Sequence, residues 1–445
     1  MSAAALRPVL ALATLLAAST CDFLGPVAHG PTEGDPPLAV IAPSPRRGPI
    51  RVSAETARAL GAATPLAPLY AALEAIDTGA ATAPVVIMQI GDSHSASDFL
   101  SGRMRELFQQ RFGAAGRGML PPGIPYDYFR PALAHVDAEG DWHRASSFSE
   151  SGPFGIGGVI QQSAIPDARM TLTETEPAGF DRAFFEVLRQ PGAGTLRLRV
   201  DDGETHDFAT AAAVAGPHWV EFNTPAGSHR ITLSAMGGGA VTVLGWGTQR
   251  ETRGVVYENL GIVGATVGVT GHWDPAIVAE EMARRDPALI VVAYGTNEGV
   301  EPPEKLAHYA EHFSARVQAL RAAAPGAAVL VIGPPDVDRK GQPPVAGCGA
   351  WVPGAWAPTP GIAIVREAQR AVAARHGWYF WDWQAAMGGP CAADRWANAA
   401  PPLEAPDHVH PKADGYRRSA DMLFREIIDG YRRYLSRPGA MPVGS

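Results

Sequence analysis

The sequence predicts an α/β protein: a parallel sheet covered by helices on both faces and interrupted by an inserted all-β module. The α/β part is predicted because apolar runs of strand length alternate with segments of helical periodicity, both before and after the insertion. The module is predicted because short, alternating strand patterns with few helices lie between these two parts.

The first strand and helix are predicted on either side of residue 93. Residues 83–90, APVVIMQI, form a continuous apolar run typical of a buried strand, and residues 97–112 repeat apolar side chains at helical spacing. Further strands are predicted at 255–262, 288–294, 327–334 and 378–383. A helix is predicted at 302–324, with one apolar face made by Leu306, Tyr309, Phe313, Val317 and Leu320. Strands that alternate with helices favour a parallel sheet.

The inserted module is expected at residues 146–250. Residues 196–200, LRLRV, alternate apolar side chains with arginines, and similar short runs follow at intervals set by turn residues. This pattern predicts a β-sandwich or jelly roll. The α/β domain is then expected in two pieces, at 56–145 and 251–436, followed by a tail at 437–445.

The N-terminus has the layout of an export signal. Residues 1–21 contain one arginine, a short apolar run and then small residues, and Cys21 ends a segment, LAASTC, that resembles a bacterial lipobox. The residues leave open whether Cys21 is lipidated, which would anchor the protein to a membrane, or whether the signal is simply cleaved. Residues 22–55 are rich in proline and predict a tether. We expect an exported protein, in the periplasm or cell envelope.

The cysteine count is compatible with a disulfide. Lipidation of Cys21 would leave Cys348 and Cys391, an even pair in an oxidising compartment. Two unrelated buried thiols are the alternative that the spacing leaves open.

The overall charge argues against nucleic-acid binding. The formal net charge is −8, and no cluster of basic residues interleaved with aromatics is present in the sequence. An acidic protein also gains no long-range attraction to an acidic glycan, so recognition of one depends on local shape and hydrogen bonds.

Ser93 follows the first predicted strand, in the stretch QIGDSHSASDFL. Ligands of open parallel sheets bind beyond the carboxyl ends of the strands, which is where Ser93 is expected. Serine is also a common helix N-cap, so its position alone favours capping over chemistry.

Three distant segments change that balance in favour of a nucleophile. Asp407 and His410, three residues apart before a C-terminal helix, supply a carboxylate and a base that together activate a serine hydroxyl. Asn297 and Gly264 each follow a predicted strand, where an amide side chain and a closely approaching backbone N–H can bind an oxyanion. We therefore expect Ser93, Asp407 and His410 as the catalytic residues, and Ser93, Gly264 and Asn297 as the oxyanion hole.

With these four blocks the chain resembles the SGNH hydrolases, also called the GDSL esterase family. The blocks are GDSH with Ser93, GIVGAT with Gly264, GTNE with Asn297, and DHVH with Asp407 and His410. The resemblance covers roughly residues 60–145 and 251–436 and implies a three-layer α/β/α fold with a flavodoxin-like sheet. The first block departs from the usual family pattern in the histidine after Ser93, and the third in the residues flanking Asn297.

These departures, the export signal and the inserted module look like the bacterial peptidoglycan O-acetylesterases. That resemblance implies a serine esterase that removes the C6 O-acetyl group of muramic acid through an acetyl-Ser93 intermediate. Alternatives are an esterase of another acetylated polysaccharide such as xylan, a glycan O-acetyltransferase, and a non-catalytic glycan-binding lipoprotein. No cofactor or metal is expected, because His408 and His410 lack further ligands at convincing spacing.

Overall fold

The computed structural model describes residues 64–350 and 352–437. The predicted signal at 1–21, with its lipidation site Cys21, and the tether at 22–55 lie outside the described residues, as does nearly all of the predicted tail. Within the described ranges, no helix is both long and apolar enough to cross a membrane.

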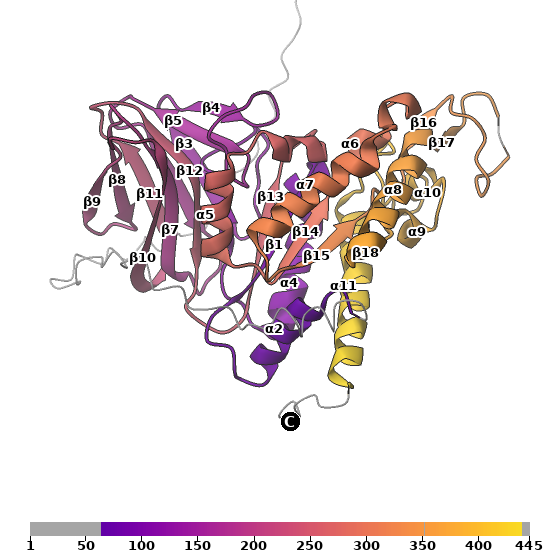
Figure 1. Cartoon of the computed structure of the whole chain (residues 1–445), viewed down its shortest axis with the longest axis horizontal. Coiled ribbons are helices and arrows are strands. Elements are labelled where there is room, and N and C mark those ends of the chain that lie inside the picture. The colour runs from indigo at the N-terminus through magenta and orange to yellow at the C-terminus, as the bar shows by residue number, and fades with distance from the viewer. Residues whose placement is uncertain (1–63, 351, 438–445) are drawn as a thin grey trace, which may run out of the picture. The chain divides into compact units, whose positions relative to one another are not determined.

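A five-stranded parallel sheet forms the centre of the α/β domain, as predicted (Figure 1). Its strands, in spatial order, are β13 (Val255–Gly261), β1 (Val85–Gly91), β14 (Leu289–Ala293), β15 (Ala328–Ile332) and β18 (Tyr379–Trp381). Taken in chain order from β1, this is the 2-1-3-4-5 order of flavodoxin-like sheets. The sheet order reverses next to β1, so the end of β1 lies at the position where such sheets bind ligands.

Helices cover both faces of this sheet (Figure 1). Side chains alternate along a strand, and accordingly Met88 belongs to one apolar core and its neighbour Ile87 to the other. The first core includes α5 (Pro275–Arg285), α7 (Tyr309–Ala323) and α8 (Pro360–His376). The second includes α2 (Ala67–Asp77), α4 (Phe99–Phe112) and α11 (Ala413–Leu435). This is the three-layer arrangement that the sequence predicts.

Short elements connect the long ones. The predicted helix at 302–324 is divided into the 3-10 turn η2 (Pro303–Leu306) and α7, and all five residues of its expected apolar face are buried. The remaining elements are α3 (Ser93–Ala96), η1 (Val267–Gly271), α6 (Thr296–Gly299), β16 (Asp338–Lys340), β17 (Trp356–Pro358), α9 (Trp383–Met387) and α10 (Ala392–Ala397).

The inserted module is a sandwich of two antiparallel sheets whose inner side chains share one core, as predicted. One sheet has the order β10-β7-β12-β5-β4, with β2 added on β12, and the other has the order β3-β6-β11-β8-β9. The strands are β2 (Gly118–Leu120), β3 (Ala134–Glu139), β4 (His143–Ser146), β5 (Val159–Ser163), β6 (Arg169–Glu174), β7 (Phe180–Arg189), β8 (Thr195–Val200), β9 (Thr205–Ala209), β10 (Gly216–Ser228), β11 (Arg230–Ala235) and β12 (Val241–Gln249).

The antiparallel sheets begin before the expected boundary at residue 146, because β2, β3 and β4 already belong to them. Strand β2 pairs with β12, so that Leu120 lies opposite Trp246, more than a hundred residues later in the chain. Strands β2 and β4 have only three and four residues, too few for a clear alternation of side chains, and in β3 only Val136 is buried. Their assignment to the sandwich comes from long-range pairing, which the sequence pattern does not contain.

Buried polar contacts join the module to the α/β domain. The N–H of Met119 in β2 and the Arg285 guanidinium in α5 both donate to the carboxylate of Glu258 in β13, each at 2.8 Å. Nearby, Glu281 in α5 accepts a hydrogen bond from the N–H of Ile156 at 2.6 Å. The sandwich is thus held against the sheet by specific contacts as well as by apolar packing.

Candidate active site

Ser93 begins the short helix α3, directly after the carboxyl end of β1. The cap of this helix is Asp92, whose Oδ1 accepts a hydrogen bond from the N–H of His94 at 3.0 Å. The helix is therefore capped by Asp92 and not by Ser93, and the Ser93 hydroxyl is free for other contacts. Gly261 makes this position possible, since a Cβ there would clash with the backbone of Ala96 in α3.

His410 and Asp407 lie beside Ser93, although more than three hundred residues separate them in the chain. The Ser93 Oγ is 3.0 Å from His410 Nε2, and His410 Nδ1 is 2.8 Å from Asp407 Oδ2. Both distances are within hydrogen-bonding range. The structure thus places the three predicted residues in the order hydroxyl, imidazole, carboxylate.

Asp407 is held in place by the backbone of its own turn. Its Oδ1 accepts hydrogen bonds from the N–H groups of Val409, at 3.0 Å, and His410, at 3.1 Å. Partial burial acts to raise the pKa of Asp407, but the hydrogen bonds from His410 and Val409 outweigh it and lower the pKa below its usual value. Asp407 is therefore ionised at neutral pH and accepts from His410 Nδ1–H, which leaves Nε2 with a lone pair toward Ser93.

His94 packs beside these residues in a fully buried position. Its Nδ1 is 2.9 Å from the hydroxyl of Tyr416, and its ring lies 5.2 Å from that of His410 and 5.3 Å from that of Trp383. Burial and the neighbouring His410 lower the pKa of His94 to about 3, so it is a neutral imidazole at neutral pH. Tyr416 was not predicted at the site, because its proximity arises only from tertiary packing.

Asn297 and Gly264 lie where the next strands end. Asn297 is in α6, after β14, and its Nδ2 donates one hydrogen bond to the carbonyl of Ala265 at 2.9 Å, leaving its second amide hydrogen available. Gly264 has a φ of +76°, a left-handed conformation that favours glycine. In the described part of the chain, the N–H groups of Ser93 and Gly264 donate no hydrogen bond. Three donors are thus free at this edge of the sheet.

Glu298, beside Asn297, supports the segment that carries Gly264. Its Oε1 accepts a hydrogen bond from the N–H of Val267 at 2.8 Å, and Val267 begins η1. Burial raises the pKa of Glu298 to about 7. The glutamate of GTNE thereby links the α6 turn to the Gly264 turn, a role that single-sequence spacing gave no means of finding.

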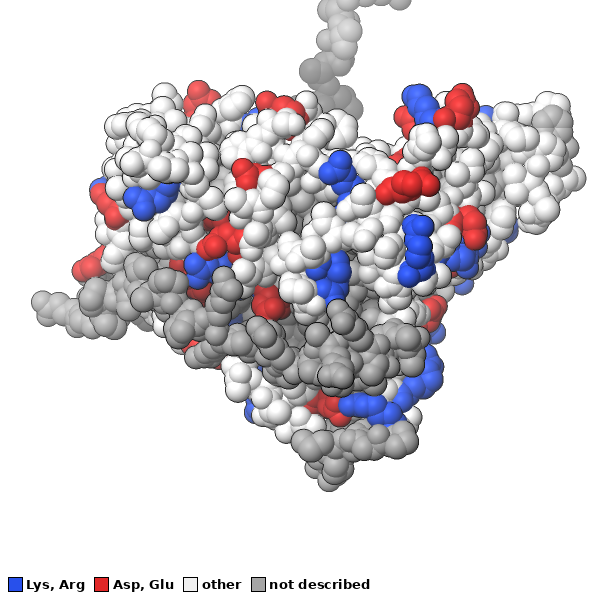
Figure 2. Space-filling view, viewed as in Figure 1, with Lys and Arg blue, Asp and Glu red and all other residues white. Residues whose placement is uncertain are grey.

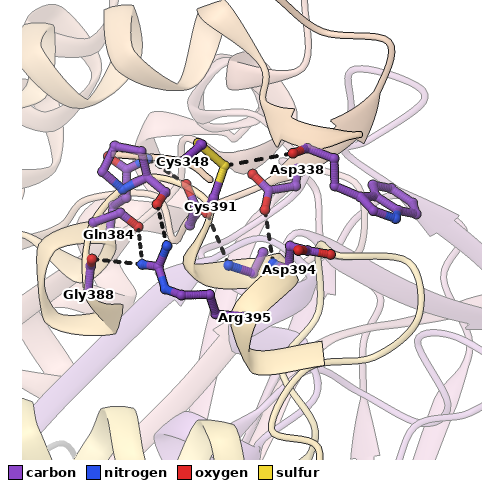
Figure 3. The surroundings of a disulfide bond; sticks show 12 residues. Asp338, Cys348, Gln384, Gly388, Cys391, Asp394 and Arg395 are labelled. Atoms are coloured by element: carbon purple, nitrogen blue, oxygen red, sulfur yellow. Dashed lines mark hydrogen bonds between the residues drawn. A yellow bond between two sulfur atoms is a disulfide. The ribbon is translucent and has the colours of Figure 1, made fainter. Parts of the chain in front are cut away.

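A disulfide supports the loop that contains Asp407 and His410. Cys348 and Cys391 are bonded, with their Cα atoms 5.4 Å apart, and Cys391 caps α10 (Figure 3). Asp394 in α10 lies 3.1 Å from His408 Nε2, and the N–H of Asp394 donates to Asp338 at 2.9 Å. The disulfide therefore fixes a helix that contacts His408, one of the two residues between Asp407 and His410.

His408 has a structural environment. Its ring stacks on that of Trp356, with centroids 3.7 Å apart, and its backbone adopts a φ of +55°. Among residues 64–350 and 352–437, no group of three or more histidine, cysteine or acidic side chains has a geometry that could hold a metal ion. The neighbouring histidines of DHVH thus have separate partners, Asp394 for His408 and Ser93 for His410.

The site is open to solvent. The side chains of His410 and Asp407 are 42% and 50% exposed, so a substrate as large as a polymer can reach them. On the face shown in Figure 2, basic and acidic residues are interspersed and neither sign forms a broad patch.

Comparison with known proteins agrees with this geometry. Residues 232–418 match the GDSL-like Lipase/Acylhydrolase family, and this range contains Gly264, Asn297, Asp407 and His410. No curated protein matches the sequence significantly. Over residues 232–418 the chain is thus similar to GDSL-like lipases and acylhydrolases.

Solved structures extend the similarity to the inserted module. A peptidoglycan O-acetylesterase is 26% identical, with a TM-score of 0.69, and the match covers 84% of this chain and 97% of that one. A family two carbohydrate esterase from Cellvibrio japonicus is 13% identical over 67% of this chain and 98% of that one, with a TM-score of 0.27. An acetyl xylan esterase is 16% identical over 39% of this chain and 80% of that one, also with a TM-score of 0.27.

Proposed function

We propose that this protein is a serine O-acetylesterase of a cell-wall polysaccharide, and that the polysaccharide is peptidoglycan, deacetylated at C6 of muramic acid. The observation that carries the chemistry is the Ser93–His410–Asp407 relay at the carboxyl edge of the sheet. The choice of substrate is supported by the similarity to a peptidoglycan O-acetylesterase, which extends over nearly all of that protein.

The first half of the reaction acetylates the enzyme. His410 Nε2 takes the proton of the Ser93 hydroxyl as Oγ attacks the acetyl carbonyl carbon, and the ionised Asp407 stabilises the resulting imidazolium. The tetrahedral intermediate collapses with cleavage of the bond between the acetyl carbon and the sugar oxygen. His410 returns the proton to that oxygen, which releases the sugar as an alcohol and leaves acetyl-Ser93.

The second half removes the acetyl group. His410 takes a proton from water, whose oxygen attacks the acetyl carbonyl, and then returns it to Ser93 Oγ as acetate leaves. These steps use only protein side chains and water, so we propose no cofactor and no metal.

The oxyanion of both intermediates is bound by the three free donors. These are the backbone N–H groups of Ser93 and Gly264 and the second amide hydrogen of Asn297. Donors already fixed in position stabilise the negative charge that develops during attack without reorganising. The hydrogen bond from Asn297 to Ala265 and the one from Val267 to Glu298 hold two of these donors in place.

We also propose that the protein acts outside the cytoplasm, in the periplasm or cell envelope, and that Cys21 is a candidate lipid anchor. The signal-like composition of residues 1–21 and the Cys348–Cys391 disulfide support this location.

The proposal is tested by measuring acetate released from O-acetylated peptidoglycan and from acetylated xylan, with wild type and Ser93→Ala in parallel. We expect release from peptidoglycan that is lost in the variant. A preference for xylan would retain the chemistry and reject the substrate. Equal activity of the variant and wild type would reject the serine mechanism, provided that both melt at the same temperature.

A further inference from the structure

A groove beside the oxyanion hole is lined by the α/β domain and by Phe148 of the module. It has a volume of about 430 Å³, within the usual range for ligand pockets. Gly264 lies in its wall, so a substrate whose carbonyl is bound at Gly264 extends directly into the groove or along its rim. Its other lining residues include Phe148, His272, His312 and Arg316.

Phe148 supplies an exposed aromatic surface at this groove. Its side chain belongs to the loop after β4, is 56% exposed, and comes within 3.4 Å of the position that a Cβ on Gly264 would occupy. Phe148 also lines a second groove, of about 340 Å³. An exposed aromatic ring that lines two grooves at a glycan esterase site is suited to packing against the apolar face of a sugar.

Arg316 supplies the positive charge of the groove. It projects from α7, and its guanidinium lies over Gly271, where a Cβ would come within 2.7 Å of it. Its Nε donates to His312 Nε2 at 3.2 Å. Within the described ranges of the chain, Arg316 has no carboxylate partner and its two terminal nitrogens make no hydrogen bond. They form a planar pair of donors that matches a carboxylate.

The two histidines add hydrogen-bonding groups to the groove. Partial burial and the adjacent Arg316 lower the pKa of His312, so it is neutral at pH 7. His272 Nδ1 lies 2.6 Å from the carbonyl oxygen of Ser147 and therefore carries a hydrogen, which leaves Nε2 for a hydrogen bond with a sugar hydroxyl. One cation without a carboxylate partner and the free ring nitrogens of two histidines fit an anionic, hydroxyl-rich ligand.

We propose that this groove is a subsite for a sugar that carries a carboxylate, with Arg316 binding the carboxylate and Phe148 packing against the ring. The inference rests on the proposed function and adds to it the group by which an acidic acetylated glycan is distinguished from a neutral one. In peptidoglycan the carboxylate belongs to the substituent on O3 of the sugar, either as a free lactyl group or within an attached peptide.

The test is an equilibrium titration of the protein with three probes. N-acetylmuramic acid carries a free lactyl carboxylate, muramyl dipeptide carries its carboxylate on the peptide, and N-acetylglucosamine carries none. We expect wild type to bind at least one anionic probe about tenfold more tightly than N-acetylglucosamine, as for one charge-assisted contact in a solvent-accessible site. The anionic probe that binds more tightly identifies the source of the carboxylate.

Two variants and one control separate the contributions. In Arg316→Gln the preference for anionic probes should disappear, whereas in Phe148→Ala the affinity for all three probes should fall together. Arg321→Gln is the matched control, because Arg321 lies on the same helix and donates to Ala324 outside the groove. Melting temperatures verify that each variant is folded.

Equal affinity of wild type for the three probes, or an unchanged preference in Arg316→Gln, would overturn the subsite. This outcome is distinguishable from failure of the proposed function, because the titration measures no turnover. Loss of the Ser93 dependence of acetate release would reject the esterase proposal and leave the titration result unaffected.

Discussion

Asn297→Ala tests the oxyanion hole most sharply, because the contacts of this side chain can be counted. The variant loses one hydrogen bond to Ala265, at 2.9 Å, and one free amide hydrogen. The first loss acts on folding and costs about 1 kcal/mol. The second acts on the transition state, where removal of one oxyanion donor costs about 2.7–4 kcal/mol, or about 100- to 1,000-fold in kcat. Since Asn297 is only half-buried, water can replace part of the contact, and we expect a loss of about 100-fold.

The assay measures kcat and KM for acetate release from O-acetylated peptidoglycan, with the melting temperature measured in parallel. Asn223→Ala, an exposed asparagine in β10, is the matched control and should behave like wild type. The predicted signature is a large fall in kcat with little change in KM and a small fall in melting temperature. A kcat within about fivefold of wild type would refute the role of Asn297, whatever the effect on stability.

Three further predictions follow from other contacts. Asp407→Asn should lower kcat by about 10³- to 10⁴-fold, because the amide oxygen keeps the backbone N–H contacts and the NH2 group then faces His410 Nδ1, where it cannot accept a hydrogen bond. A fall in kcat of less than about tenfold would contradict the role of Asp407. Replacing Cys348 and Cys391 by serine should cost about 2–4 kcal/mol of unfolding free energy and lower activity through the His410 loop; unchanged denaturation curves would refute the bracing role. Burial and repulsion from Glu281 raise the pKa of Glu186, and burial raises the pKa of Glu281. The folded protein therefore retains protons on these carboxyl groups that the unfolded chain releases. The stability that this pair contributes is present below the ordinary carboxyl pKa and is lost as pH rises. The melting temperature of Glu186→Gln, relative to that of wild type, should therefore be higher at pH 9 than at pH 5. Melting temperatures of variant and wild type that change in parallel with pH would contradict this.

The chemistry-bearing residues could be predicted because each is marked by its place in the chain. Ser93 follows a strongly apolar strand, and His410 and Asp407 form a compact pair before a long amphipathic helix. Local patterns of this kind depend on neighbours within a few residues, which a single sequence contains. The parallel sheet and the sandwich were predictable for the same reason.

The supporting contacts could not be predicted, because they join segments far apart in the chain. The pairing of β2 with β12 moved the start of the sandwich ahead of residue 146. The packing of Tyr416 on His94 and the approach of Phe148 to Gly264 likewise depend on tertiary structure. Each of these pairs is separated by more than a hundred residues, and no periodicity specifies such a contact.

The central claim is that Ser93 forms a covalent acetyl intermediate. The most direct measurement is mass spectrometry of wild type quenched rapidly during turnover of an O-acetylated substrate, with peptide mapping of the modified residue. The account predicts a mass increase of one acetyl group on the peptide containing Ser93, and no such increase in Ser93→Ala. Turnover without acetylation, or acetylation of another residue, would contradict it.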